Sequence, residues 1–298
     1  MLMVGSTVVA SKIIGRGLSP MTATALRFAI ALPLLAVLMR LKGARLPRPD
    51  WRDGLLLLAQ AALGSVGYTV LLIKGTQLTS ASDAGIIVGT LPGVTALTAA
   101  VLLRERPSVA TLLAVGLATA GALLVSLNSS AAAARHSLLG DALVLGAVVC
   151  ESVFILLNKR LRISIEPLPL ATVMAGLGLV VCLPWAIVEM AHQSGSLPIS
   201  ALVGVAYYAV IPTVAGFWLW YAGSARVPGG EAAIFTAVAP LGAVVLARAI
   251  FGEPLTPARL GGLALVSVAI LVVALKDSAA GADRRGATLI REGCKTGS

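Results

Sequence analysis

The chain has 298 residues, of which 58% are hydrophobic and only 12% are charged. Soluble domains carry about 45–50% apolar and about 25% charged residues, so this composition excludes a water-soluble globule. The formal charge of +10 would favour nucleic-acid binding in a soluble protein, but here the basic residues lie between apolar blocks rather than in one patch. We therefore expect an integral membrane protein with no nucleic-acid partner.

Ten apolar runs follow one another along the chain, separated by charged residues, prolines and glycines. A helix needs about 20 apolar residues to cross the hydrocarbon core of a bilayer. The runs are Met1–Ile14, Thr22–Met39, Gly54–Ile73, Ala84–Leu103, Val109–Leu127, Leu138–Leu157, Leu168–Val188, Ile199–Ala222, Ala232–Phe251 and Ala258–Leu275. Helices are predicted because a lone span in lipid must satisfy its backbone hydrogen bonds internally, and no run alternates as a barrel strand does. The predicted fold class is an all-α integral membrane protein with ten transmembrane helices.

The Lys and Arg residues are distributed unevenly between the two sides of this ten-span arrangement. Sixteen of the 23 basic residues, including those of the C-terminal tail, lie on one side. The other side holds only Arg16, Lys74, Arg135 and Arg259. Because cytoplasmic loops carry the excess of Lys and Arg, both termini are predicted to be cytoplasmic, in a multi-pass protein of the cytoplasmic (inner or plasma) membrane. The tail over 276–298 lacks apolar periodicity and is predicted to be disordered.

An internal repeat is found when the chain is shifted by 148 residues. The matched pairs are Asp83 with Glu231, Pro92 with Pro240, Glu105 with Glu253, and Leu112 with Leu260. The shift predicts a first repeat over 1–127, a linker over 128–137 and a second repeat over 138–275. Each repeat holds five spans, and because five is odd, the second repeat must enter the membrane upside down relative to the first. Inverted repeats of this kind are typical of secondary transporters.

Several segments resemble a known transporter family. They are GSTVVASK near the start, LRF in the second span, SDAGIIVGTLPGVTALTAAVLLRERPS around the fourth, and GEP in the copy of that segment at the ninth. These segments are similar to the two EamA domains of the drug/metabolite transporter superfamily. The resemblance covers nearly all of residues 1–275 and implies ten helices, an inward- and outward-open cycle, and a central cavity between the repeats. The chain departs from the family pattern at Val4, where the family often has tryptophan, and at Lys74, where it has a small residue.

Glu151 is the first candidate for a functional charge. It lies near the middle of the run Leu138–Leu157, where an ionised carboxylate costs about 3 kcal/mol or more unless it is paired or hydrated. The surrounding VVCESVFILLNKRL also resembles the first helix of small multidrug-resistance proteins, in which the glutamate handles both protons and cationic substrate. We expect Glu151 to face a cavity as a substrate ligand or proton carrier. The alternative is that it hydrogen-bonds to Ser, Thr or Asn side chains and locks two helices together.

Two basic residues lie within the first two spans. Arg27 and Lys12 are placed to present positive charge to an anionic or zwitterionic substrate. The alternative is snorkelling, in which a long side chain carries its charged head to the interface. For Lys12, close to Gly15 and Arg16, snorkelling is the favoured interpretation. Arg27 is deeper and belongs to the LRF pattern, so a structural or gating partnership and direct substrate contact both stay open.

Four acids stand at helix ends that the repeat makes equivalent. Asp83 and Glu231 precede the fourth and ninth helices, where an acid satisfies free N–H groups and favours the positive end of the helix dipole. Glu105 and Glu253 follow the same helices beside basic neighbours and are expected to be interfacial charges. All four are therefore assigned helix-capping or structural roles.

Prolines and tyrosines mark further cavity positions. Pro92 and Pro240 remove a backbone donor at matched sites, so the fourth and ninth helices are expected to kink there and to present freed carbonyls to a midplane site. Tyr207 and Tyr208 lie deep enough in the eighth span to line a cavity and to contact a cation or a ring. Tyr68, deep in the third span, is a similar candidate.

Other polar or kinking residues are given weaker roles. Gln60, Thr69 and Thr213 are candidates for neutral hydrogen bonds between helices, which are common and worth about 1 kcal/mol each. Pro212 has no symmetric proline partner and is expected only to bend its span.

The sequence offers no enzyme or cofactor pattern. His136 and His192 lack metal-ligand spacing, and neither a phosphate-binding loop nor a Ser–His–Asp set is visible. We therefore expect no catalytic residues, no metal and no other cofactor.

The leading prediction is a secondary transporter, either a monomer or a homodimer, that exports a small amino-acid-like metabolite or a drug-like compound by alternating access, with proton exchange as the coupling. Three alternatives remain open at this stage. They are an uncoupled uniporter or exchanger, a membrane-embedded enzyme, and a non-transporting membrane scaffold.

Overall fold

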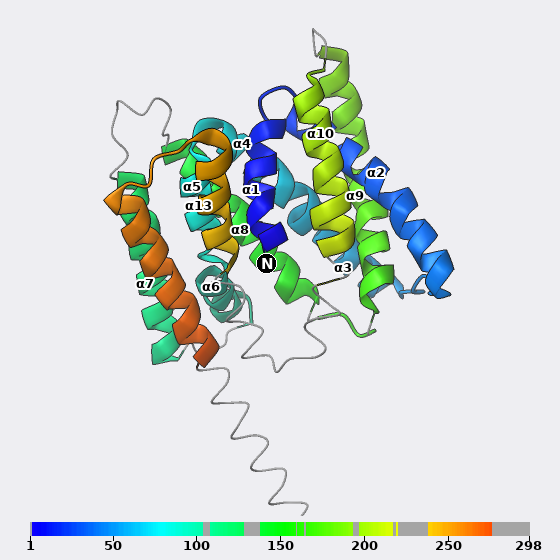
Figure 1. Ribbon diagram of the computed structural model, residues 1–298. Coiled ribbons are helices and arrows are strands. Elements are labelled where there is room, and N and C mark those ends of the chain that lie inside the picture. The colour runs from blue at the N-terminus through cyan, green and yellow to red at the C-terminus, as the bar shows by residue number, and fades with distance from the viewer. Residues whose placement is uncertain are drawn as a thin grey trace, which may run out of the picture.

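The computed structural model describes residues 2–103, 108–127, 138–158, 160–163, 165–192, 197–216, 219 and 238–275. Within these ranges every regular element is a helix and none is a strand. The predicted all-α class is therefore confirmed. The helices pack together as a bundle, with α1 between α13 on one side and α10 on the other (Figure 1).

The helices divide between the two halves of the chain. The first half holds α1 (Leu2–Ile14), α2 (Pro20–Lys42), α3 (Trp51–Gln60), η1 (Ala61–Gly67), α4 (Tyr68–Leu78), α5 (Ala81–Val88), α6 (Leu91–Leu103) and α7 (Val109–Leu127). The second half holds α8 (Leu138–Asn158), α9 (Pro167–His192), α10 (Ile199–Tyr208), η2 (Ala209–Gly216), α13 (Val238–Phe251) and the helix Pro257–Leu275. This last helix is the orange-red one that lies beside α7 (Figure 1).

Length and composition decide which of these helices are able to cross a membrane. Among the described residues, seven continuous helical stretches are long and apolar enough, and the bent pair α5–α6 is an eighth if it counts as one span. The other two apolar helices, α1 and α13, have 13 and 14 residues. The structure thus confirms a multi-pass helical protein, while the count of ten spans stays a prediction. The start of the predicted ninth span and the tail after Leu275 lie outside the described residues.

The predicted fourth span is broken rather than continuous. Its two parts, α5 and α6, are bent by 45° around the turn at Gly89 and Thr90. Pro92, at the second position of α6, has no N–H to donate to the carbonyl of Val88, so a hydrogen bond that would join the two parts is missing and a bend is favoured at this point. Thr90 instead closes the end of α5, where both its N–H and its hydroxyl donate to the carbonyl of Ile87, at 2.9 and 2.7 Å.

Two segments of π-helix interrupt the third and eighth spans. They are η1 (Ala61–Gly67) and η2 (Ala209–Gly216), and the 148-residue shift that aligns the two halves of the sequence carries η1 onto 209–215. In η2 the cause is Pro212, which cannot donate to the carbonyl of Tyr208. The hydroxyl of Thr213 donates to that carbonyl instead, at 2.9 Å. Wider turns of this kind are rare and occur frequently at functional sites.

The interior is built from two main apolar clusters. One joins α1, α4, α5, α8 and α13, and the other joins α2 and α9 to the two π-helical segments. Large apolar side chains also cover much of the outer surface, among them Val101, Trp185 and Val245. An exterior this apolar suits contact with lipid chains rather than with water.

Candidate functional site

A cavity of about 140 Å³ lies between the two halves of the chain. It is lined by Val4, Thr7, Arg27, Gly64, Ser65, Tyr68, Thr69, Glu151, Phe154, Met174, Tyr208, Pro212 and Thr213, and we call it the central cavity. Both π-helical segments contribute to its wall, each through two adjacent residues. Under the 148-residue shift these coincide, since Gly64 matches Pro212 and Ser65 matches Thr213.

Arg27 supplies the positive charge of the central cavity. Its side chain comes from α2 and is 7% exposed. Its Nη1 donates to the hydroxyl of Thr69 at 2.7 Å, and its guanidinium lies 4.4 Å from the ring centre of Phe28 and 4.8 Å from that of Tyr208. Its Nε has no hydrogen-bond partner, and no carboxylate in the described chain lies within ion-pair distance. A buried cation held by ring faces and one hydroxyl keeps donor capacity for an anionic group.

Glu151 supplies the acidic group of the central cavity. It lies on α8, is partly buried and lines the same cavity as Arg27. Among the described residues it forms neither a hydrogen bond nor an ion pair. The alternative expectation, in which its hydrogen bonds lock two helices together, therefore finds no such bond in the part of the chain that is described. One cavity thus holds a basic and an acidic side chain that do not form an ion pair with each other.

The tyrosines predicted to line a cavity separate into two groups. Tyr68 and Tyr208 border the central cavity, together with Arg27 and Glu151. Tyr207 does not. It is 39% exposed, and its hydroxyl donates to Oγ of Ser6 on α1 at 2.8 Å.

The symmetric prolines also lie away from the central cavity. Neither Pro92 nor Pro240 is among its lining residues. A Cβ added at Gly89, beside the break before Pro92, would lie 3.0 Å from the ring of Pro240. The matched interruption that does border the cavity is the pair of π-helical segments.

Sequence reasoning underrated several cavity residues. Pro212 was expected only to bend its span, and Thr213 and Thr69 only to supply common interhelical hydrogen bonds. Phe154 and Met174 form the apolar part of the wall and carried no sequence signal. One sequence pattern could have located this site. Under the 148-residue shift, Pro212 matches Gly64, a small residue that allows the close approach of Phe154.

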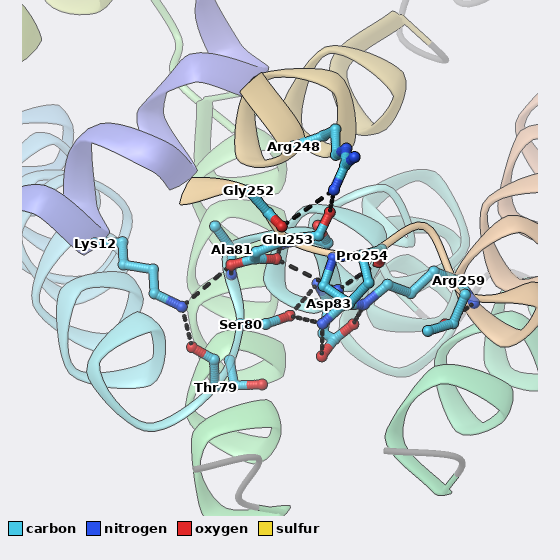
Figure 2. A network of polar contacts seen from close by, with 12 residues as sticks. Lys12, Thr79, Ser80, Ala81, Asp83, Arg248, Gly252, Glu253, Pro254 and Arg259 are labelled. Carbon is cyan, nitrogen blue, oxygen red and sulfur yellow. Dashed lines mark hydrogen bonds and ion pairs between the residues drawn. The ribbon is translucent and has the colours of Figure 1, made fainter. Parts of the chain in front are cut away.

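A second polar site, which we call the end network, lies at one end of the bundle and consists of Lys12, Ser80, Asp83, Glu253 and Arg259 (Figure 2). The carboxylate of Glu253 accepts the backbone N–H groups of Ala81 and Ser82, both at 2.9 Å. Lys12 donates to the same carboxylate at 3.3 Å. Glu253 therefore caps α5 in the first half of the chain rather than serving its own helix.

Asp83 and Arg259 form the other part of the end network. Nε and Nη2 of Arg259 donate to the two carboxylate oxygens of Asp83 at 2.8 and 3.2 Å. Nη2 also donates to the hydroxyl of Ser80 at 2.8 Å. That hydroxyl is the N-cap of α5, since it accepts the N–H of Asp83. Asp83 thus lies in the first turn of α5 and bonds across to Arg259 in the second half. The sequence predicts that Asp83 caps this helix, but the hydroxyl of Ser80 is the cap.

The charge state of Glu253 follows from these contacts. Burial by itself would raise the pKa of this carboxyl group, but hydrogen bonds from Ser82 and Ala81 and the charge of Lys12 together lower the pKa below its usual value of 4.5. Glu253 is therefore an anion at neutral pH. Lys12, for which snorkelling was favoured, reaches this carboxylate and the carbonyl of Thr79 at 3.0 Å. The equivalent acids Glu105 and Glu231 lie outside the described residues.

The fold and the cavity define a class of protein: a multi-pass helical membrane protein whose two halves enclose a small charged cavity. Within the part of the chain that is described, no cluster of His, Cys, Asp or Glu is arranged to hold a metal ion. A sequence model described as the EamA-like transporter family matches residues 1–127 and 138–275. The chain belongs to this family, which confirms the resemblance to EamA domains, and its general function is transport across a membrane.

Relatives of known sequence are also transporters by name. A Bacillus subtilis protein named uncharacterized transporter YetK is 32% identical over 93% of this chain and 84% of its own length. A Streptantibioticus cattleyicolor protein named probable terminal-alkyne amino-acid exporter is 28% identical over 83% of this chain and 81% of its own. A crystal structure that is 20% identical in sequence aligns with a TM-score of 0.66 over 93% of this chain and 94% of its own. That likeness establishes the fold alone.

Proposed function

We propose that this protein exports a small zwitterionic, amino-acid-like metabolite across the cytoplasmic membrane by alternating access. The observation that carries the proposal is that Arg27 and Glu151 line one cavity without neutralising each other in an ion pair. An amino acid presents a carboxylate for the guanidinium and an ammonium for the glutamate. Because both side chains line the same cavity, such a ligand would form one charge-assisted interaction with each of them.

The size and lining of the cavity support a metabolite over a drug-like compound. Drug-sized ligands occupy roughly 300–1,000 Å³, whereas the central cavity measures about 140 Å³. The side chains of Phe154 and Met174 give it an apolar wall that suits a short hydrocarbon side chain. The relative named as an amino-acid exporter supports the same substrate class and direction.

We propose ten spans in two inverted five-helix repeats as the architecture behind alternating access. Two structural observations support the duplication: η1 and η2 occupy matched positions, and both line the central cavity through matched residues. The end network supports a closed state at one end of the path, since it ties α1 and α5 to α13 and the helix that follows. In alternating access, such contacts break at one end of the path while equivalent contacts form at the other end. Two inverted halves are expected to pass through this cycle.

Proton exchange is the proposed coupling, with Glu151 as the carrier. A carboxylate that faces a cavity without a protein partner is able to take up either a proton or the substrate ammonium, but not both. Competition for one site would link proton entry to substrate exit. The second candidate is an uncoupled exchanger, in which Glu151 binds the ammonium group alone.

The test uses the purified protein in lipid vesicles and three isosteric probes. Radiolabelled leucine carries both charges, isopentylamine lacks the carboxylate, and 4-methylpentanoate lacks the ammonium group. The proposal predicts counterflow of leucine, with little competition from either analogue. Transport of isopentylamine in preference to leucine would replace the zwitterion with a cation. A second measurement with an imposed pH gradient separates proton exchange from uncoupled exchange.

Reporter fusions test the proposed orientation, in which both termini are cytoplasmic. Reporters placed after Arg45 and after Arg160 are expected on the cytoplasmic side. A reporter between Phe251 and Pro257 is expected on the opposite side. Detection of the first two reporters on different sides would rule out the ten-span inverted arrangement.

A further inference from the structure

A second, larger cavity of about 810 Å³ lies at the end of α2. Its wall is formed by the last turns of that helix, by the connecting residues 44–48 and by Thr172 near the start of α9. Three of its lining residues are arginines, Arg40, Arg45 and Arg48. The cavity therefore gathers three positive charges where a candidate membrane span ends.

These three charges have no acidic partner in the described chain. No Asp or Glu lines the cavity. Asp50, the nearest acid in sequence, caps α3 and lies 3.9 Å from Arg162. Because like charges in one cavity repel one another, an anion that enters it relieves that repulsion and gains charge-assisted hydrogen bonds.

Apolar side chains lead away from the arginines along the outer face of the bundle. Leu34, Val37 and Leu41 follow one another at helical spacing on α2, so they form one stripe, and all three are exposed. Trp51, at the start of α3, is 79% exposed. An indole at a span end is typical of the interface between hydrocarbon and headgroups. The basic cavity thus opens next to a surface suited to an acyl chain.

We propose that this cavity binds the phosphate headgroup of an anionic phospholipid, with its acyl chains along the stripe on α2. Basic pockets between spanning helices are the arrangement that such headgroups occupy. The continuous apolar stripe and a volume far above that of a phosphate ion favour a lipid over a soluble anion. This site is separate from the central cavity, so it does not depend on which substrate is transported.

The test measures quenching of Trp51 by brominated lipid. In a variant whose other tryptophans, Trp185, Trp218 and Trp220, are replaced by phenylalanine, brominated phosphatidylglycerol is expected to quench Trp51 at lower mole fraction than brominated phosphatidylcholine. Each arginine exchanged for glutamine should lower this preference about fivefold. The triple variant R40Q/R45Q/R48Q should abolish it.

A matched control separates a built pocket from general attraction of basic residues to the membrane. Lys42 and Arg52 flank the same connection but do not line the cavity, so the variant K42Q/R52Q should keep the preference. An equal loss in this control, equal quenching by both lipids, or loss of the preference on adding inorganic phosphate would each overturn the proposal. Native mass spectrometry of the unmodified protein is a second measurement that needs no variant. The protein is expected to retain phosphatidylglycerol in preference to phosphatidylcholine.

Discussion

The central cavity and the end network both hold charged side chains inside the bundle, and they differ in how those charges are matched. In the central cavity, Arg27 and Glu151 face a shared space without an ion-pair partner among the described residues. In the end network, both carboxylates, those of Asp83 and Glu253, already meet cations and backbone amides. The proposed ligand would supply the partners missing from the first arrangement, whereas the second has its partners within the chain.

This difference has an energetic meaning. A charge kept inside a membrane protein without a partner costs about 3 kcal/mol or more, so it is retained only where a function requires it. A matched buried pair adds little net stability, because desolvation offsets most of the attraction, yet removal of one partner costs about 3–5 kcal/mol. A paired network at the end of the bundle is therefore costly to break by removing one partner, even though the intact pair adds little net stability.

The largest expected effect comes from removing the cation of the central cavity. Arg27→Ala should weaken leucine counterflow by about 30-fold or more, because truncating one partner of a buried charged contact costs about 2–5 kcal/mol. Arg27→Lys keeps the charge but loses the planar contact with the rings of Phe28 and Tyr208, so an intermediate loss is expected. The measurement is the concentration of leucine that half-saturates counterflow in vesicles.

Arg16→Gln is the matched control for that experiment. Arg16 stacks on Phe251 at 4.8 Å and lies away from the central cavity, so its loss should leave half-saturation unchanged. Size-exclusion profiles confirm that each variant is folded. Unaltered leucine affinity in folded Arg27→Ala would show that the cavity charge is structural.

The next largest effect concerns coupling. Glu151→Gln removes the only acid among the described residues that line the central cavity and keeps its shape, so transport driven by a pH gradient should be lost while the protein still reaches the membrane. If Glu151 binds only the ammonium group, the same variant should lower leucine affinity without changing the response to the gradient. Comparing gradient-driven flux with counterflow at equal pH separates the two outcomes. A variant with wild-type behaviour in both assays would exclude a role for Glu151.

A smaller effect is expected in the end network. Arg259→Gln and Asp83→Asn should each lower the free energy of unfolding by about 2–3 kcal/mol, since each removes one partner of a largely buried pair. The double variant should cost less than the sum, because both changes remove the same Arg259–Asp83 interaction. Arg162→Gln is the control. Its contact with Asp50 is long, at 3.9 Å, and exposed, so a change below about 1 kcal/mol is expected. Additive losses in the first pair would mean that the two residues act separately.

The contrast between the two regions also marks what could be predicted from the sequence. Charges inside apolar runs are costly wherever the chain folds, so Arg27 and Glu151 were identifiable as candidates without any structure. Their meeting in one cavity was not, because spacing along the chain does not tell which faces of α2 and α8 converge. Glu253 illustrates the same limit. It bonds to the amide of Ala81, a residue 172 positions away, while its sequence neighbours suggested a local pair.

The helical breaks show a second limit. Pro92 and Pro240 were the visible symmetric signal, and a break is present before Pro92, but the cavity formed at the π-helical segments instead. In the third span no proline marks the interruption, since the residue equivalent to Pro212 is Gly64, which packs against Phe154. A close approach by another helix depends on tertiary structure, so residue type alone could not locate it.

The smallest expected effect, a dependence of the end network on pH, sharpens the comparison between the two regions. The pKa of Glu253 is lower in the folded protein than its usual value of 4.5, so its bonds stabilise the fold fully above that pH and are lost as pH falls through the lower, folded value. The thermal midpoint of the wild type should exceed that of Glu253→Gln by a few degrees from pH 5 to 8, and the gap should close below pH 4.5. A gap that instead widened in acid would mean that protonated Glu253 makes the stronger contacts with α5, and the end network would then tighten in acid.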